Sequence, residues 1–424
     1  MLEKRKPLPI HEAVGKIMDI KIDQETEIVP LKDSLNRFLA EDIKAKHDVP
    51  HFNRSPYDGF AIRAEDTRLA ETGNSIEFEV IEKLAAGTVA EKKVGPFQAS
   101  RIMTGAQMPD GADTVIMLEL VKTYEKNNKD YISIKRKQHS GENVSFKGED
   151  AKQGELLVQK GTIINPGVVA VLATFGYHQV KTAKKPVIGL FATGTELLEV
   201  SEELVPGKIR NSNAHMIQAQ AERAGAEAKY YGQLPDDIDI CYSAIKQALT
   251  EVDILITTGG VSVGDYDIMP DIYKRLEADV LFNKVAMRPG SVTTVAKLDR
   301  KILYGLSGNP SACYVGFELF VRPVIRTKLF SDKPHLRREE AWLNVDFPKA
   351  NPFTRLIRGN LSFEQGKLRA EPSGLDKSSV VMSLAGANAL IVLPSGTRGY
   401  QKGDIVDVLL LEDYEGSKGA FKGV

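Results

Sequence analysis

The chain has 424 residues, of which 42% are hydrophobic and 27% are charged. At roughly 100–200 residues per domain, this length predicts about three or four domains. The 56 basic and 57 acidic residues give a formal net charge of -1, which argues against a nucleic-acid binder that works through bulk positive charge. The two cysteines, Cys241 and Cys313, exclude a disulfide framework and any multi-cysteine zinc or iron–sulfur site.

The start of the chain is charged and no apolar stretch follows it, so we expect no secretory signal. The longest apolar stretches cover residues 168–174 and 380–393. A membrane span needs roughly 20 mostly apolar residues. The first stretch is too short, and Ser383 and Asn388 interrupt the second. We therefore expect a soluble, cytoplasmic protein that binds neither a membrane nor nucleic acid.

The first 184 residues mix helical and β patterns. Apolar residues recur at helical spacing over 8–19 and again over 32–43. Short β-like runs dominate from 57 to 138, with glycine, proline and asparagine between them, and this pattern predicts an all-β lobe. The runs cover 75–83, 114–121 and 131–135. A strand with a turn over 154–164 and a short helix over 167–177 follow the lobe.

Buried-type strands and amphipathic helices alternate from 186 to 330, and this alternation predicts a mostly parallel, doubly wound α/β domain. The predicted strands cover 187–192, 228–232, 253–258, 292–296 and 302–306, and the predicted helices cover 213–224, 237–250, 269–278 and 310–329. Asn309 is the expected N-cap of the last helix, with Pro310 at its first position. Strands and turns return after 334 and indicate a small β-barrel or sandwich.

These patterns divide the chain into four predicted domains. Residues 1–48 and 139–184 form a discontinuous linker domain, and residues 49–138 form a β lobe inserted into it. Residues 185–332 form the α/β domain, and residues 333–424 form the C-terminal β domain.

Three loops that contain glycine each follow a predicted strand of the α/β domain: 193–196, 258–267 and 305–311. Glycines let backbone N–H groups approach a phosphate, although in any single loop they explain a tight turn equally well. None of the loops matches the P-loop or the dinucleotide fingerprint. Three such loops at one edge of a sheet favour a phosphorylated ligand. The candidate substrate-binding residues are Gly194, Gly259, Gly260, Ser262, Gly264, Gly308, Asn309 and Pro310.

Acidic residues recur at the same loops: Glu196, Asp236, Asp237, Asp265 and Asp267. Carboxylates beside phosphate-binding loops suit Mg²⁺, which prefers oxygen ligands. Helix N-capping explains Asp236 or Asp237 equally well. Lys284 and Arg288 are four residues apart near a strand end, so they could reach one anion or form a solvated pair.

The inserted lobe contributes two polar loops, and a third follows it in the sequence. Asp58 lies in a tight turn over 55–61, Thr104 follows a strand that ends near Arg101, and Asp150 follows a glycine and a glutamate. From the residues alone, an Asx turn accounts for Asp58 as well as catalysis does. The seven histidines have no H-E-x-x-H spacing and no evident Ser–His–Asp arrangement, which argues against a zinc or serine hydrolase.

Seven motifs, collinear over nearly the whole chain, resemble those of the molybdopterin molybdenumtransferases, which include the MoeA proteins and the E domain of gephyrin. Residues 55–61 resemble S-x-M-D-G-[YF]-A, residues 101–119 resemble R-I-M-T-G-A…P-x-G-A-D…E, and residues 148–150 resemble G-E-D. Residues 193–197 resemble T-G-x-E-L, 259–267 resemble G-G-V-S-V-G-x-x-D, 287–290 resemble K-P-G, and 305–310 resemble G-L-P-G-N-P.

The resemblance implies an L-shaped homodimer that inserts molybdate into adenylyl-molybdopterin with Mg²⁺, giving molybdenum cofactor and AMP. It also implies an active site that combines the β lobe of one subunit with the α/β domain of the other. The catalytic residues that it implies are Asp58, Thr104, Asp150, Glu196, Asp267, Lys284 and Arg288. The implied metal ligands are Glu196, Asp236 and Asp267, with Asp236 or Asp237 as a further substrate contact, and the implied molybdate contacts are Arg358 and Ser378.

The sequence departs from the family pattern at two places. Ser291 stands where many members have a second lysine, and Ser307 stands where a proline is common. Two alternatives stay open: an adenylyltransferase of the same pathway, which shares the glycine loop, and a non-catalytic scaffold like the gephyrin E domain. The adenylyltransferase and molybdoenzyme maturation proteins are also the candidate protein partners.

Overall fold

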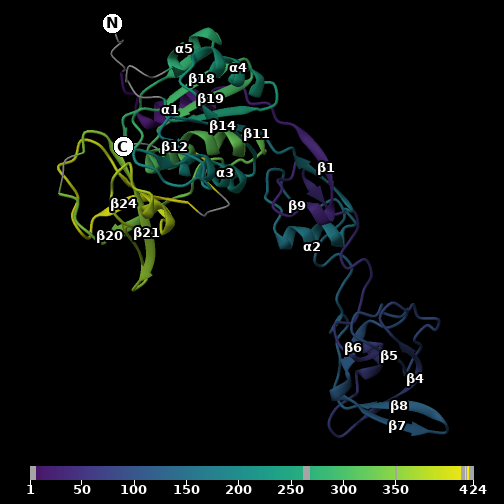
Figure 1. Cartoon of the computed structure of the whole chain (residues 1–424). Helices are drawn as coiled ribbons and strands as arrows, with labels where there is room; N and C mark the ends of the chain where they lie inside the picture. The colour runs from purple at the N-terminus through teal and green to yellow at the C-terminus, as the bar shows by residue number, and fades with distance from the viewer. Residues whose placement is uncertain (1–5, 261–267, 349–350, 412–415, 417, 420–424) are drawn as a thin grey trace. The chain divides into compact units, whose positions relative to one another are not determined.

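The computed structural model describes residues 6–260, 268–348, 351–411, 416 and 418–419. The chain divides into two compact units, whose elements are labelled in Figure 1. Unit 1 comprises Met1–Glu41, Gln159–Ala173 and Tyr177–Val424, and unit 2 comprises Asp42–Val158 and Thr174–Gly176. The division into four domains stays a prediction.

A six-stranded sheet forms the centre of unit 1. In spatial order it contains β14 (Glu227–Leu234), β11 (Val187–Thr193), β15 (Ile254–Thr258), β19 (Lys301–Leu306), β18 (Thr294–Leu298) and β16 (Asp279–Phe282). The first four strands are parallel, as predicted, while β18 runs antiparallel to both of its neighbours, β19 and β16. Only Asp299 and Arg300 connect β18 to β19, and a connection this short permits a hairpin but no parallel crossover.

Helices cover both faces of this sheet, which confirms the doubly wound α/β prediction. One face packs against α3 (Ser212–Ala224) and against a continuous helical segment made of α6 (Pro310–Gly316), the π-helical turn η4 (Phe317–Val321) and α7 (Arg322–Lys328). The other face packs against α4 (Ile238–Ala248) and α5 (Met269–Arg275). Because side chains alternate along a strand, β15 gives Ile254 and Ile256 to the first core and Leu255 to the second.

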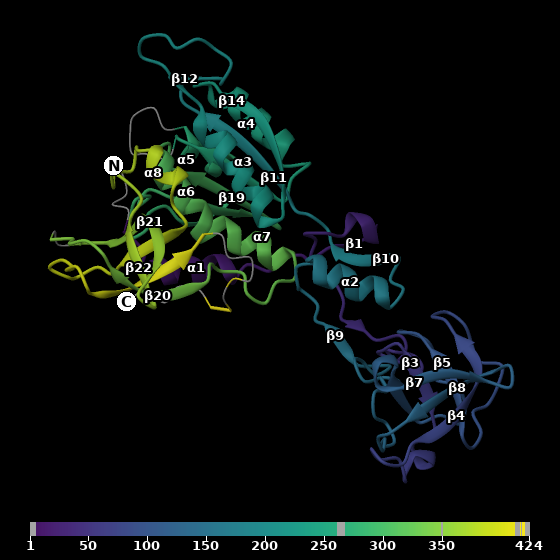
Figure 2. The same ribbon diagram turned by 90° about the horizontal axis from the view of Figure 1, so that it is seen from below.

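A closed barrel occupies the C-terminal part of unit 1 (Figure 2). Its strands are β21 (Thr354–Glu364), β22 (Lys367–Pro372), β20 (Arg338–Leu343), β24 (Ile405–Leu410) and β23 (Ala389–Leu393), and β23 pairs back with β21 to close the ring. Of the two predicted architectures, the structure has the barrel. The short strand β17 (Met287–Arg288) pairs with β21 and so connects the chain before β18 to the barrel. Helix α8 (Met382–Ala385) lies between β22 and β23 in the sequence.

The remaining elements of unit 1 flank the inserted lobe in the sequence or belong to the α/β domain. They are α1 (Ile10–Met18), β1 (Thr26–Pro30), α2 (Pro166–Thr174), β10 (Gln179–Ala183) and, at the α/β domain, β12 (Leu197–Leu198) and β13 (Ile209–Arg210). The helices predicted over 8–19 and 167–177 are present. The helix predicted over 32–43 is wrong. The chain there forms a 3-10 turn, η1 (Leu31–Asp33), and then Asn36 takes a φ of 62°, a left-handed conformation that cannot continue a right-handed helix.

Unit 2 contains the inserted lobe, a second six-stranded sheet. Its strands in spatial order are β6 (Thr114–Met117), β3 (Gly59–Ile62), β5 (Gln98–Ile102), β4 (Ile76–Leu84), β8 (Lys129–Ile134) and β7 (Lys122–Lys126). The 3-10 turns η2 (Ala64–Thr67) and η3 (Leu118–Leu120) and the strand pair β2 (Ile43–Lys44) and β9 (Leu156–Val158) complete the unit. Phe60, Phe78, Ile116 and Ile132 fill one of its cores. The runs predicted over 75–83 and 131–135 are strands, the run over 114–121 is a strand only as far as Met117, and β3 and β7 were not predicted.

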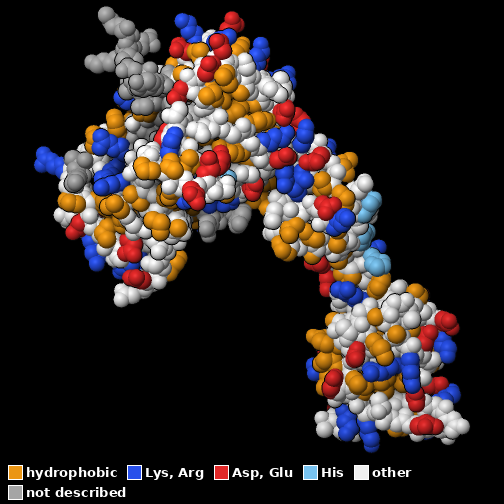
Figure 3. Space-filling view, in the orientation of Figure 1, with side chains coloured by type: hydrophobic (Ala, Val, Ile, Leu, Met, Phe, Trp, Pro, Cys, Tyr) orange, Lys and Arg blue, Asp and Glu red, His pale blue; other side chains and the backbone are white. Residues whose placement is uncertain are grey.

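Acidic and basic side chains are interspersed over the visible face of the molecule in Figure 3. This mixture agrees with the formal net charge of -1. In the part of the chain that the structure describes, no helix has the length and apolar character needed to cross a membrane.

Candidate functional site

A cavity of about 1020 Å³ lies at the carboxyl ends of β11, β15 and β19 in unit 1. All three predicted glycine loops contribute to its wall. The predicted site residues that line it are Gly194, Glu196, Asp236, Gly259, Gly260, Gly308, Asn309 and Pro310. The structure therefore brings these residues together at one edge of the sheet, while the ligand that they bind stays a prediction. Ser262, Gly264, Asp265 and Asp267 lie outside the described residues.

Close backbone contacts between the loops explain why two of these positions are glycine. The hydroxyl of Thr193 donates to the carbonyl of Thr258 at 3.1 Å, and the N–H of Gly259 donates to the carbonyl of Leu306 at 2.9 Å. A Cβ on Gly259 would lie 2.7 Å from the carbonyl oxygen of Thr193, and one on Gly260 would lie 2.9 Å from the Thr193 hydroxyl. Both glycines also have positive φ, so a side chain would clash and strain the backbone.

The structure distinguishes the two aspartates that the sequence left as alternatives. Asp236 lines the cavity, and no hydrogen bond or ion pair to another described group occupies its carboxylate. Asp237 is the N-cap of α4, where its Oδ1 accepts the N–H groups of Asp239 at 2.9 Å and Ile240 at 3.0 Å. The capping interpretation therefore fits Asp237, and the cavity interpretation fits Asp236.

Glu196 and Asp236 are the carboxylates that could hold a metal ion in this cavity. Both side chains are exposed, and neither carboxylate is bound by another described group, so their oxygens are available. Oxygen donors of this kind fit Mg²⁺. Two carboxylates are an incomplete set, and across the described ranges no group of three or more histidine, cysteine or acidic residues could hold a metal ion.

The cavity is also lined by two asparagines that were not identified from the sequence. Asn213 is 8% exposed, and its Nδ2 donates to the carbonyl of Gly308 at 2.8 Å, so it holds the third loop in place. Asn211 is the N-cap of α3 and donates to the Tyr230 hydroxyl at 2.8 Å. Asn213 begins the helix predicted over 213–224 and Asn211 precedes it, and no motif marks either residue. Ser307, one of the two departures, also lines the cavity, and its hydroxyl accepts the N–H of Asn309 at 3.2 Å.

Lys284 and Arg288 do not line this cavity. The carbonyl of Lys284 accepts the N–H of Leu8 at 3.0 Å, and the guanidinium of Arg288 lies 5.9 Å from the centre of the Phe353 ring. Their predicted catalytic roles have no support from this geometry and stay predictions.

The side chain of Arg358 is buried on the face of β21 that it shares with Leu356, whereas Ile357 points into the barrel. The guanidinium is 1% exposed and donates to the carboxylate of Asp376 at 3.0 Å and to the Ser383 hydroxyl at 3.3 Å. It donates as well to the carbonyls of Leu375 and Lys377. Arg358 therefore binds residues 375–377, and its predicted contact with molybdate stays a prediction. Ser378 is nearer the cavity, because its carbonyl accepts the N–H of Ser311 at the start of α6.

In unit 2, Asp58 and Thr104 line a second cavity of about 430 Å³ together with Glu119. The Oδ1 of Asp58 accepts both the backbone N–H of Thr104 at 2.7 Å and its hydroxyl at 2.8 Å. These hydrogen bonds, with Arg101 nearby, hold the pKa of Asp58 below its usual range. Asp150 is exposed and does not line this cavity, and its backbone N–H donates to the carbonyl of Val49 at 3.0 Å.

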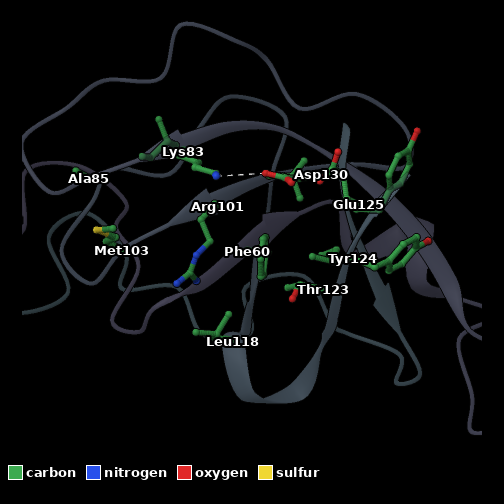
Figure 4. Close-up of a pocket in the computed structure, with 14 residues that line it drawn as sticks. Phe60, Lys83, Ala85, Arg101, Met103, Leu118, Thr123, Tyr124, Glu125 and Asp130 are labelled. Atoms are coloured by element: carbon green, nitrogen blue, oxygen red, sulfur yellow. Dashed lines mark ion pairs between the residues drawn. The ribbon is translucent and has the colours of Figure 1, made fainter. Parts of the chain in front are cut away.

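A third cavity, of about 550 Å³, lies in the same unit, and Figure 4 shows residues that line it. The third and second cavities share a boundary, since Met103 and Leu118 line one while Thr104 and Glu119 line the other. Figure 4 shows Arg101 next to Phe60, with the Lys83–Asp130 ion pair of 3.2 Å on one side. Arg101 donates to the carbonyl of Gly59 at 3.1 Å and so supports the turn that carries Asp58.

A doubly wound sheet whose glycine loops surround one cavity belongs to the class of α/β proteins that bind ligands at the carboxyl ends of their strands. Comparison with protein families specifies the class further. Residues 8–176 match the "MoeA N-terminal region (domain I and II)", residues 189–327 match the "Probable molybdopterin binding domain", and residues 340–411 match the "MoeA C-terminal region (domain IV)".

Whole-length relatives give the same result. The chain is 59% identical over 418 residues to a molybdopterin molybdenumtransferase of Bacillus subtilis, covering 99% of this chain and 97% of the relative. It is 50% identical over 411 residues to one of Staphylococcus epidermidis, covering 97% of each. A crystal structure of a molybdopterin biosynthesis moeA protein from Pyrococcus horikoshii matches with a TM-score of 0.81 at 33% identity, covering 96% of this chain and 100% of that chain. The chain therefore belongs to the molybdopterin molybdenumtransferase (MoeA) family.

Proposed function

We propose that this protein is a molybdenumtransferase of molybdenum cofactor biosynthesis. It inserts molybdenum from molybdate into adenylyl-molybdopterin and releases AMP. The observation that carries this proposal is the cavity at the carboxyl ends of β11, β15 and β19, in which three glycine loops meet Glu196 and Asp236. Identity of 59% to a molybdopterin molybdenumtransferase over nearly the whole chain supports it.

The cavity residues suit a substrate that contains two phosphates linked as a phosphoanhydride. Backbone N–H groups beside Gly194, Gly259 and Gly308 are donors of the kind that bind phosphate oxygens. Glu196 and Asp236 would hold Mg²⁺, which, when bound, neutralises charge on the phosphoanhydride as it breaks. Asn213 keeps the Gly308 carbonyl in a fixed position, so the third loop is held for binding. The chain thus contributes binding and positioning, and the dithiolene of the substrate supplies ligands to the molybdenum.

Asp58 and Thr104 form the second part of the proposed site. The two hydrogen bonds from Thr104 favour an ionised Asp58 at neutral pH. In line with the family resemblance, we propose a homodimer in which each active site takes Asp58 and Thr104 from one subunit and Glu196 and Asp236 from the other. Closed two-fold symmetry is the commonest arrangement of homo-oligomers.

The decisive experiment measures AMP release from adenylyl-molybdopterin by the purified protein, with and without molybdate and with and without Mg²⁺. The proposal requires AMP release that depends on both. Consumption of ATP with formation of adenylyl-molybdopterin would identify an adenylyltransferase instead, and binding without turnover would identify a scaffold. Tungstate in place of molybdate, in the same assay, reports the oxyanion preference. A cytoplasmic location and a supplying adenylyltransferase as partner belong to the same proposal.

A further inference from the structure

Asp376 lies at the centre of a cluster of charged side chains in the barrel. One of its oxygens accepts from Arg358 at 3.0 Å, and the other accepts from Arg355. Both arginines belong to β21, whereas Asp376 lies in the segment that follows β22. The side chain of Arg358 is 1% exposed and that of Asp376 is 18% exposed, so water screens the pair weakly. The carboxylate therefore ties the segment after β22 to β21.

Arg358 also fixes this segment, from the outer face of β21. Its guanidinium donates to the carbonyls of Leu375 at 3.4 Å and Lys377 at 3.2 Å, on either side of Asp376. Its Nε donates to the hydroxyl of Ser383 at 3.3 Å, beyond the segment. Burial lowers the pKa of this guanidinium and Asp376 opposes the shift, so the carboxylate keeps the buried charge in place.

The segment continues from this cluster directly to the cavity of the α/β domain. The N–H of Ser311 donates to the carbonyl of Ser378 at 3.0 Å, and the Ser311 hydroxyl donates to the carbonyl of Val380 at 2.6 Å. Ser379 and Val381 line the cavity together with residues of the glycine loops. Ser311 follows Asn309 and Pro310, which also line it. The barrel therefore supplies part of the wall through residues 375–381, here named the barrel loop.

We infer that Asp376 is a positioning residue of the substrate cavity: acting through Arg355 and Arg358, it holds the barrel loop against the start of α6. The substrate whose binding depends on this loop is molybdate, because the loop carries Ser378, the predicted oxyanion contact, next to Ser379 in the cavity wall. The choice of molybdate rests on the proposed function. The positioning of the loop does not, since it follows from the hydrogen bonds alone.

The test compares Asp376→Asn with the matched variant Asp407→Asn. Asp407 accepts from Arg338 at 2.7 Å in the same barrel, its side chain is 11% exposed, and it does not line the cavity. With Asp376→Asn we expect the molybdate KM to rise about tenfold while kcat at saturating molybdate stays within about twofold. Asp407→Asn should leave both constants as in the wild type, and Asp376→Glu, which keeps the charge, should restore most of the molybdate affinity.

A second measurement follows the loop without any turnover. Lys377 is exposed in the barrel loop, so limited trypsin digestion reports on how often the loop opens. Cleavage after Lys377 should become about tenfold faster in Asp376→Asn and stay unchanged in Asp407→Asn. An unchanged molybdate KM, or a fall in kcat alone that parallels a lower melting temperature, would overturn the inference. If the wild type releases no AMP, the proposed function fails. The digestion still tests the positioning role in that case, because equal cleavage of the wild type, Asp376→Asn and Asp407→Asn would reject it.

Discussion

Asp58 and Thr104, 46 residues apart in the sequence, are joined by two hydrogen bonds to one carboxylate oxygen. Asp58 directly precedes β3, and Thr104 follows β5, the strand that pairs with β3. The pairing of these two strands therefore brings the aspartate and the threonine together. Because both bonds favour the charged carboxylate, they hold the pKa of Asp58 below its usual range.

Removing the Thr104 hydroxyl should raise the pKa of Asp58. We expect Thr104→Val to shift this pKa upward, because the backbone N–H remains but the hydroxyl donor is lost, whereas Thr104→Ser should leave it nearly unchanged. The ionised form is favoured in the folded protein, so its contribution to stability is present above the unfolded pKa and is lost as pH falls through the folded pKa. In Thr104→Val this contribution should be smaller, and its loss should be complete at a higher pH. Carboxyl NMR titration measures the shift directly, and an identical titration for the wild type and the valine variant would contradict it.

The two neighbouring aspartates at 236 and 237 should respond differently to the same substitution. Asp236→Asn removes a carboxylate from the cavity, so we expect turnover to fall at least about tenfold and to need more Mg²⁺. Asp237→Asn should retain both turnover and stability, because asparagine caps helices about as well as aspartate. Mg²⁺ titrations of AMP release distinguish the two. Equal losses in both variants would show that the cavity lining does not mark the metal ligand.

Gly59 should tolerate no side chain, because β3 and β6 approach closely at this residue. A Cβ there would lie 2.1 Å from the carbonyl oxygen of Ile116, so we expect Gly59→Ala to cost about 1–3 kcal/mol of unfolding free energy. Gly73→Ala is the matched control in the same lobe, since a Cβ added at Gly73 would have no neighbouring atom within 4 Å. Urea unfolding followed by hydrogen exchange of lobe peptides measures the difference. Trp342, the single tryptophan, reports on the barrel and should unfold alike in both.

Much of the α/β domain could be predicted from the sequence, because its local patterns agree with its tertiary structure. Buried parallel strands such as 187–192 read as continuous apolar runs, and helices such as 213–224 start and end at recognisable residues. Alternation of strands and helices then places three loops at one edge of the sheet. The convergence of Gly194, Gly259 and Gly308 on one cavity follows from this topology.

Contacts that depend on the register of distant strands could not be predicted. Arg358 meets Asp376 only because β21 and β22 pair and the barrel loop returns across β21, and no spacing in the sequence encodes that return. Asn36 carries no signal that distinguishes a helical residue from one with a φ of 62°, so the pattern over 32–43 indicated a helix. The pairing of Arg101 with the carbonyl of Gly59 is equally invisible in a motif.

Substitutions of Ser378 and Arg358 should affect the molybdate requirement and the unfolding free energy differently. Ser378→Ala removes a hydroxyl that makes no hydrogen bond to another described group, so we expect unchanged stability but a molybdate requirement at least about tenfold higher. Arg358→Ala should raise the molybdate requirement too, and should also lower the unfolding free energy by about 1–3 kcal/mol, because its buried hydrogen bonds to the barrel loop are lost. Molybdate titrations and urea unfolding of both variants test this pair. A Ser378→Ala protein with the wild-type titration would remove Ser378 from the oxyanion site.

The last prediction concerns the assembly of the active site from two subunits. Asp58 belongs to unit 2 and Glu196 to unit 1, so a subunit with Asp58→Asn keeps an intact α/β cavity and a subunit with Glu196→Gln keeps an intact lobe. Each variant alone should be inactive. When the two are mixed under conditions of subunit exchange, a shared site predicts that one of the two sites in every mixed dimer contains both intact carboxylates. Activity should then reappear, approaching about a quarter of the wild-type value, since about half of the dimers are mixed at equal concentrations.

If one chain supplied both residues, every site in a mixed dimer would lack one carboxylate, and mixing would restore nothing. Native mass spectrometry of the two proteins, one with heavy isotopes, must first show that mixed dimers form, because failure to exchange would also give no activity. The double variant, with Asp58→Asn and Glu196→Gln in one chain, is the matched control. Mixed with wild type, it leaves each shared site in the mixed dimer with only one of its two carboxylates, so a shared site predicts that these mixed dimers are inactive. Carboxylates from one chain would instead leave the wild-type half of each mixed dimer active.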